Sequence, residues 1–405
     1  MTSILTGVRI LEVAEHTFVP AASAMLADLG AEVIKVEHVE RGDAMRGHET
    51  AGMVRTNQDV HALLEHSNRG KRSIGLDLTD PEGRDILAKL ASRCDVFLTN
   101  KLPGVRSKLG ITRDELRSAN AQIIYVCGTG QGERGPDADK GAYDSLAFWA
   151  RAGVAMGVKR PEYQLLPMPP GPGFGDSIGA MTIAGAIMGA LFHRERTGEP
   201  ITVDVSLLAT GLWAMGQTAA LSMVAGEPFG PGIDRDLTRN PLSRVYRTKD
   251  GRYIALTCLH AGTYWKSLCD SIGRPELAID ERFADHRSLI ANTYEAVDVL
   301  SATFELSTVD EWRQRLESFS GQWAVVQDVL EACTDRQTIA NGYVQECHTA
   351  SGAPFHLIAA PMQYDGQPCP TRRAPEFNEH GDQILSELGI EWDDIVDLKL
   401  AGVVA

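Results

Sequence analysis

The fold is decided near the amino terminus, where residues 7–13 read GVRILEV, residues 20–29 read PAASAMLADL and residues 31–37 read AEVIKVE. Pro20 suits the first turn of a helix, Gly30 suits its end, and the Val/Ile runs suit buried parallel strands. The same alternation returns as a strand over 73–78, a helix over 80–91 and strands over 95–100 and 122–127. It predicts an α/β fold with a doubly wound, Rossmann-like sheet that binds ligands at the carboxyl ends of its strands.

The sequence pattern of the chain changes from residue 167 onward. Residues 167–175, PMPPGPGFG, are too rich in Pro and Gly for a helix or strand and lead directly into Asp176 and a long apolar segment. From about residue 240 the pattern turns to short strands and charged amphipathic helices, which indicates a smaller α+β domain. The tail from residue 354 contains an amphipathic helix that a glycine ends at 389.

Composition excludes several classes of protein. The 405 residues are 43% hydrophobic and 23% charged, with a net charge of -15, so binding to nucleic acid or an anionic membrane is not expected. Residues 1–110 carry 14 Lys or Arg against 15 Asp or Glu, so an anionic ligand should prefer this part. Seven scattered cysteines and no export signal predict a cytoplasmic protein without disulfides or a zinc site. The apolar stretch 178–192 is too short for a membrane span, and the stretch 206–226, which is long enough, is interpreted as a buried helix.

Few local motifs point to chemistry. Residues 130–135, GQGERG, match a dinucleotide fingerprint, but PDAD follows instead of a helix, so a tight turn is expected. The histidines show no metal spacing, and no permanent cofactor is predicted. Asp176 is the unusual residue, because it follows a glycine-rich turn and precedes an apolar helix. Two interpretations stay open: Asp176 caps the helix, or its carboxylate is a nucleophile.

The chain resembles the class III coenzyme A (CoA) transferase family, also called the CaiB/BaiF family, nearly from end to end. The resemblance rests on an ordered series of motifs: GVRILEV (7–13), LGAEVIKVE (29–37), NRGKRSIGLDL (68–78), Asn100 with Pro103-Gly104, Tyr143-Asp144, Gly175-Asp176, NPL (240–242), YRTKDG (246–251) and Glu379-His380. It implies a large domain from residues 1–210 and the returning segment 336–405, a small domain with linkers over 211–335, and an interlocked homodimer.

The resemblance also implies an activity. Family members move CoA from an acyl-CoA thioester to a free carboxylic acid, and the position matching Asp176 carries the nucleophile, which forms an anhydride and then an aspartyl thioester. Asp144 matches an acidic position beside it, although a plain surface acid is an equal alternative. The implied CoA-contacting residues are His16 and Thr17 after Glu15, His38 with Arg41 nearby, Lys71, Arg72, Asn100, Lys101 and Lys108. A basic turn is the alternative for Lys71 and Arg72, and a solvated surface residue is the alternative for His38, Arg41 and Lys108. Lys101 replaces an aromatic residue of the family.

Two other functions remain alternatives. Racemases of 2-methylacyl-CoA in the same family use a His and an Asp to move an α proton, but this chain has Ala142 where that histidine would stand. A non-catalytic acyl-CoA-binding protein is the other alternative. Transfer is preferred because Asp176 and its glycine are present, and neither the acyl donor nor the acceptor follows from the sequence.

Overall fold

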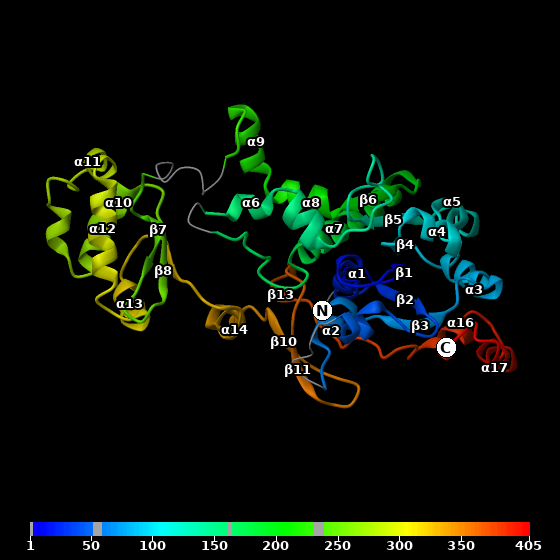
Figure 1. Ribbon diagram of the computed structural model, residues 1–405. Helices are drawn as coiled ribbons and strands as arrows, with labels where there is room; N and C mark the ends of the chain where they lie inside the picture. The colour runs from blue at the N-terminus through cyan, green and yellow to red at the C-terminus, as the bar shows by residue number, and fades with distance from the viewer. Residues whose placement is uncertain (1–2, 52–58, 161–163, 230–238) are drawn as a thin grey trace. The chain divides into compact units, whose positions relative to one another are not determined.

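The computed structural model describes residues 3–51, 59–160, 164–229 and 239–405. The chain forms two compact units, Met1–Gly232 with Gln337–Ala405 (the large unit) and Ile233–Arg336 (the small unit) (Figure 1). The first segment extends past residue 210, where the sequence analysis ended it. The reason is α8 (Leu207–Ala214), which continues across that position and packs on η2 (Ser145–Arg151) and α7 (Phe174–Thr197).

A parallel sheet of six strands organises the large unit, in the order β3-β2-β1-β4-β5-β6. The five strands expected from the Val/Ile runs are present, and the sixth is one that the sequence analysis missed. The order reverses between β1 and β4, so the crevice at their carboxyl ends is where such a sheet binds ligands. The strands are β1 (Arg9–Val13), β2 (Glu32–His38), β3 (Arg72–Leu76), β4 (Val96–Thr99), β5 (Ile124–Thr129) and β6 (Thr202–Ser206).

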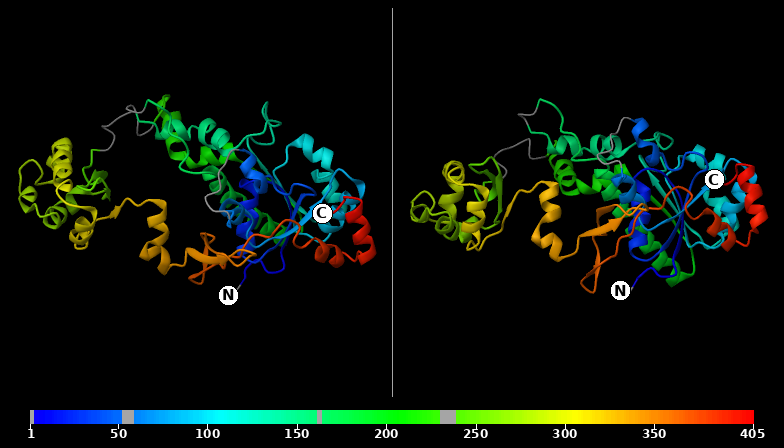
Figure 2. Two further views of the ribbon diagram at one scale, coloured as in Figure 1. Left: turned by 60° about the horizontal axis from the view of Figure 1, so that its bottom comes forward. Right: turned by 90° about the horizontal axis from the view of Figure 1, so that it is seen from below.

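Helices cover both faces of this sheet because neighbouring strand residues point to opposite faces. On one face, Ile10 and Val126 pack against α1 (Phe18–Asp28) and α7. On the other face, Leu11 and Phe97 pack with α3 (Pro81–Ala91), α5 (Arg113–Ala119) and the C-terminal helices α16 (Gly381–Glu387) and α17 (Trp392–Leu400). Both views of Figure 2 show these red C-terminal helices beside the blue and cyan elements of the first part of the chain.

The other elements of the large unit are shorter. They are η1 (Ala44–Ala51), α2 (Ala62–Asn68), α4 (Pro103–Leu109), α6 (Val154–Val158), α9 (Gly216–Ala225), β10 (Val344–His348), β11 (Pro354–Ile358), β12 (Gln363–Tyr364) and β13 (Gln367–Pro368), with α15 (Arg336–Ala340) at the border between the units.

The small unit has an antiparallel sheet, in the order β7-β8-β9, with helices around it. Its core holds Tyr246 stacked on Phe304, with ring centroids 5.1 Å apart, and the buried Trp312 beside them. The elements are β7 (Ser243–Arg247), β8 (Tyr253–Thr257), β9 (Trp323–Val325), α10 (Ala261–Ser271), η4 (Pro275–Ala278), α11 (His286–Ala291), α12 (Thr293–Phe304), α13 (Val309–Leu316) and α14 (Val329–Thr334).

The two apolar stretches differ from the sequence interpretation. The first belongs to α7, which has 24 residues and is long and apolar enough to cross a membrane, a test that core helices of soluble proteins also pass. The second is not one buried helix: α8 and α9 meet at a bend of 73°, and no residue of α9 is buried. Gly216, at the start of α9, follows directly after this bend.

A buried charge network, made by Glu12, Lys35, Asp43 and Lys71, joins the strands beneath the crevice. Lys35 Nζ lies 2.8 Å from Glu12 Oε1 and 2.7 Å from Asp43 Oδ2, and Lys71 Nζ lies 2.8 Å from Glu12 Oε2. Ser23 also donates to Glu12. Burial alone raises the pKa of Glu12, but Lys35 and Lys71 together hold it below its usual range.

This network predicts a large loss of stability for Glu12→Gln. Both buried lysines would lose a charged partner, which costs about 3–5 kcal/mol of the free energy of unfolding. Urea unfolding of the purified protein measures the loss. Glu32→Gln is the matched control, because Glu32 pairs with Arg9 and Arg72 at the surface and its loss should cost at most about 1 kcal/mol. Equal losses in the two variants would contradict a structural role for the network.

Candidate active site

Asp176 lies in the first turn of α7, and the N-cap residue of this helix is Gly173. The interpretation of Asp176 as a helix cap is therefore wrong. Gly173 has φ 66°, a left-handed conformation that glycine adopts easily. Gly175 packs flat on Phe148, since a Cβ at this position would lie 2.6 Å from the ring. Only glycine lets the chain approach this closely, and the approach fixes where α7 starts.

The carboxylate of Asp144, which precedes α7 in the chain, binds the backbone at the start of this helix. Its Oδ2 accepts the Gly175 N–H at 3.1 Å, and its Oδ1 accepts the Ser145 N–H at 2.7 Å, where η2 begins. The element η2 is a π-helix, a rare form that often occurs at functional sites. Two carboxylates thus meet at one helix start. Burial raises the pKa of Asp176 to about 7, and the negative charge of Asp144 adds to the rise.

The loop between β1 and α1, residues 14–17, is held from two sides. Asn100, after β4, accepts the Glu15 N–H at 3.2 Å and donates to the Glu15 carbonyl at 2.7 Å. Asp43 Oδ1 accepts the His16 N–H at 3.1 Å. His16 has φ 68°, a strained conformation for this residue type, and such strain often marks functional sites. Asp43 is a site residue that the sequence analysis missed.

The same loop reaches the two acids. The His16 ring meets Tyr143 edge-on, with ring centroids 5.6 Å apart, and Tyr143 is the neighbour of Asp144. Thr17 faces the start of α7, because a Cβ on Gly173 would lie 3.1 Å from Thr17 Cγ2. His16, Thr17, Asp144 and Asp176 therefore gather in one place. The GQGERG segment lies nearby as bends without a following helix, as expected for a turn.

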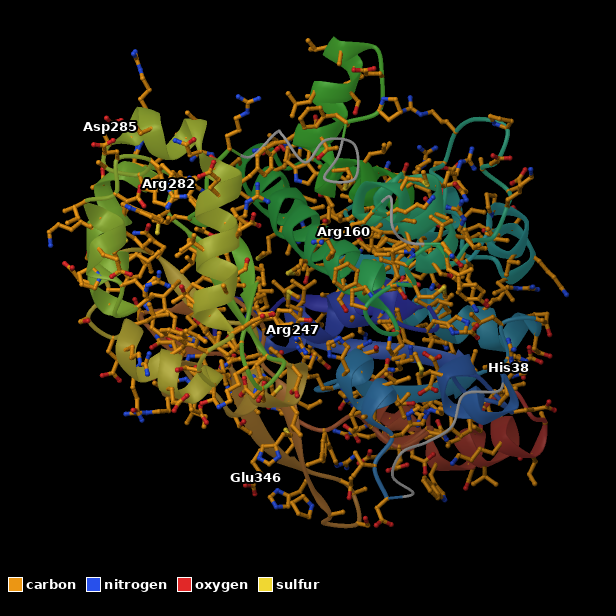
Figure 3. All side chains as sticks on the ribbon, turned by 60° about the vertical axis from the view of Figure 1, so that its left-hand side comes forward. His38, Arg160, Arg247, Arg282, Asp285 and Glu346 are labelled. Carbon is orange, nitrogen blue, oxygen red and sulfur yellow. The ribbon has the colours of Figure 1, made fainter. Side chains whose placement is uncertain are left out.

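Several predicted cationic and polar residues lie at the carboxyl edge. Lys101, next to Asn100, has its Nζ 2.9 Å from Glu15 Oε2. His38 is exposed at the carboxyl end of β2 (Figure 3), and its Nδ1 accepts the Glu40 N–H at 3.2 Å. Lys108 is exposed in the last turn of α4. His38 and Lys101 thus lie at the carboxyl ends of β2 and β4, and Lys108 lies one helix further along the chain.

The structure places Lys71 and Arg72 elsewhere. Lys71 is buried, and its ammonium donates to Glu12, to the Pro20 carbonyl at 2.9 Å and to Asn68 at 3.0 Å, so no donor remains for a phosphate. Arg72 begins β3, at the amino edge of the sheet, and pairs with Glu32 and Glu387. Neither side chain lies where contacts with CoA phosphates were expected. A sequence motif does not show whether a lysine is buried or at which edge of the sheet an arginine lies.

Over the described residues, no group of three or more His, Cys, Asp or Glu side chains could hold a metal ion. The groups that gather at the site include the carboxylates of Asp144 and Asp176 and the backbone amides at the start of α7. A carboxylate with a pKa near neutrality, half-buried beside glycine backbone, can act as a nucleophile or as a proton acceptor.

Comparisons with known proteins identify the family. The family model described as CoA-transferase family III matches residues 5–381. The (R)-2-hydroxy-4-methylpentanoate CoA-transferase of Clostridioides difficile is 28% identical over 402 residues, with 99% of each chain covered. The succinyl-CoA:glutarate CoA-transferase of Homo sapiens is 29% identical, with 99% of this chain and 90% of that one covered.

A solved structure agrees with both. The crystal structure of a CAIB/BAIF family protein from Brucella suis has a TM-score of 0.81 and 27% identity, with 95% of this chain and 99% of that chain covered. The sequence matches and the similarity of fold thus extend over almost the whole chain. The chain belongs to CoA-transferase family III and is an enzyme of that family.

Proposed function

We propose that this enzyme transfers CoA from an acyl-CoA thioester to a free carboxylic acid through covalent intermediates on Asp176. The observation that carries the proposal is the half-buried Asp176 carboxylate beside Asp144, in the first turn of a helix that glycines allow to pack closely. The named relatives support CoA transfer in general. These relatives are named for different acids, so they do not identify the donor and acceptor acids of this chain.

The reaction balances as four displacements. The Asp176 carboxylate attacks the thioester carbonyl, the C–S bond breaks, and CoA thiolate leaves behind a mixed anhydride. The thiolate then attacks the aspartyl carbonyl and releases the donor acid, which gives an aspartyl thioester. The acceptor carboxylate attacks this thioester and forms a second anhydride with release of thiolate. Attack of the thiolate on the acceptor carbonyl makes the new acyl-CoA and restores Asp176.

CoA binding is assigned to the carboxyl edge of the sheet. The strand order is that of the doubly wound Rossmann fold, whose ligands lie at the point where the order reverses. The residues assigned to CoA are those found at or near this edge: His16, Thr17, His38, Asn100, Lys101 and Lys108. Lys71 and Arg72 are left out, because one is buried and the other lies at the opposite edge.

We further propose that two chains form the active enzyme. Apolar side chains stand exposed along α8 and α9: Trp213 is 87% exposed, Val224 is 90% exposed, and Met223 lies beside it. An apolar surface of this kind marks a protein contact. A second copy of this chain is the occupant that agrees with the family expectation of a homodimer.

The covalent step has a direct test. We expect incubation with a panel of acyl-CoA thioesters, followed by hydroxylamine or borohydride, to leave a mass change on the peptide that contains Asp176. Asp176→Ala should show no adduct and no exchange, while it still binds CoA. Solvent deuterium at the α carbon without any adduct would instead favour racemisation. CoA binding with neither signal would favour a non-catalytic protein.

The pH dependence tests the pair of acids. The nucleophile is the ionised Asp176, so kcat/KM should fall as the pH drops through about 7. Asp144→Asn removes a negative charge that raises the pKa of Asp176, so the acid limb should move to lower pH. Asp139→Asn, an exposed acid of the preceding loop, should leave the profile in place. An unmoved profile in Asp144→Asn would refute the tuning role of Asp144.

Light scattering after size exclusion tests the assembly. The wild type should have twice the mass of one chain, and Trp213→Glu should shift it toward one chain because a charge would be buried in the contact. Leu400→Glu places the same charge on an exposed residue of α17 and should leave the dimer intact. A monomeric wild type would show that the dimer proposal is wrong.

A further inference from the structure

The carboxylate of Glu15 forms ion pairs with two cationic side chains at the crevice, those of Lys101 and Arg41. Glu15 Oε2 lies 2.9 Å from Lys101 Nζ, and Glu15 Oε1 lies 3.4 Å from the Arg41 guanidinium. The three residues come from three different segments: Glu15 follows β1, Arg41 follows β2, and Lys101 follows β4. Because β1 and β4 are the neighbours between which the strand order reverses, this ion cluster stands at the expected ligand position of the sheet.

The side chain of Glu15 can leave this cluster without moving the loop. Asn100 holds both the N–H and the carbonyl of Glu15, so the backbone is fixed independently of the carboxylate. The pairs are also partly open to solvent, since the side chains of Glu15, Lys101 and Arg41 are 18%, 19% and 60% exposed. The pair with Arg41 is open to solvent on the Arg41 side and contributes little to stability, whereas the pair with Lys101 is mostly shielded, so the carboxylate exchanges only for an anion that replaces both contacts.

We infer that Glu15 stands in for a phosphate group of CoA: it holds Lys101 and Arg41 in the free enzyme and is displaced when CoA binds. This rests on the proposed function, since it assumes that CoA is the ligand. A phosphate carries more charge and more acceptor oxygens than a carboxylate, so it makes stronger contacts with the two cations. Glu15 therefore weakens CoA binding and favours release of CoA products.

The inference predicts that removing a negative charge improves binding. Glu15→Gln keeps the size of the side chain, and calorimetric titration with CoA should show binding about two- to fivefold tighter than in the wild type, in line with the strength of exposed ion pairs. The gain should shrink at high salt, which screens such pairs. In the background of Lys101→Met, which should itself weaken binding, Glu15→Gln should bring a smaller gain.

Glu40→Gln is the matched control. Glu40 is an exposed acid beside Arg41, and within the described residues its carboxylate pairs with neither Arg41 nor Lys101, so the same change in net charge should leave CoA affinity unchanged. Titration with 3′-dephospho-CoA locates the phosphate. A gain that persists assigns the cations to the diphosphate, and a gain that vanishes assigns them to the 3′-phosphate; both results support the inference.

The two hypotheses fail in different ways. If the wild type binds CoA but Glu15→Gln binds it equally or more weakly, the displacement of Glu15 is overturned while the proposed function stands. An equal gain in Glu40→Gln also overturns it, since general charge would then explain the effect. A wild type that binds no CoA or acyl-CoA at all would overturn the proposed function, and the role of Glu15 with it.

Discussion

The ion network beneath the crevice is the constraint on which the site depends. Glu12 lies between Lys35 and Lys71, and Lys35 in turn holds Asp43, so four charges from β1, β2 and the segments after β2 and before β3 are fixed in the core. Buried charges of this kind tolerate little displacement, because each one is costly without its partner. Asp43 connects this network to the loop after β1, because its carboxylate accepts the backbone N–H of His16 and holds that residue in its strained conformation.

The active centre adds a second constraint of opposite character. At Asp144 and Asp176 two like charges are brought together, and no cation is paired with Asp176 in the described residues. The cost of this arrangement is met by packing: Gly175 lies against Phe148, and Asp144 satisfies the N–H groups at the starts of η2 and α7. A network of paired charges therefore lies beneath a site where two carboxylates are close together, and this proximity helps to raise the pKa of Asp176.

Sequence patterns predicted five of the six strands of the large unit, because Val/Ile runs between turn residues are typical of buried strands. They missed β6, because its sequence TVDVS has no continuous Val/Ile run. The patterns and the family resemblance selected Asp176, Asp144, His16 and Asn100, which lie at or near the crevice, but misjudged Lys71. Its burial depends on Glu12, 59 residues away, and Asp43 was missed for the same reason: both roles arise from contacts between distant segments.

The helix α7 connects chemistry with assembly. Its first turn carries Asp176, and the same helix leaves Met181 and Phe192 exposed, as α8 and α9 leave Trp213 and Val224 exposed. A partner that covers this surface would bury apolar area on the helix that carries Asp176. Assembly would then stabilise the helix whose start Asp144 and the glycines define, so the geometry of the carboxylate pair and the association of two chains would depend on the same packing.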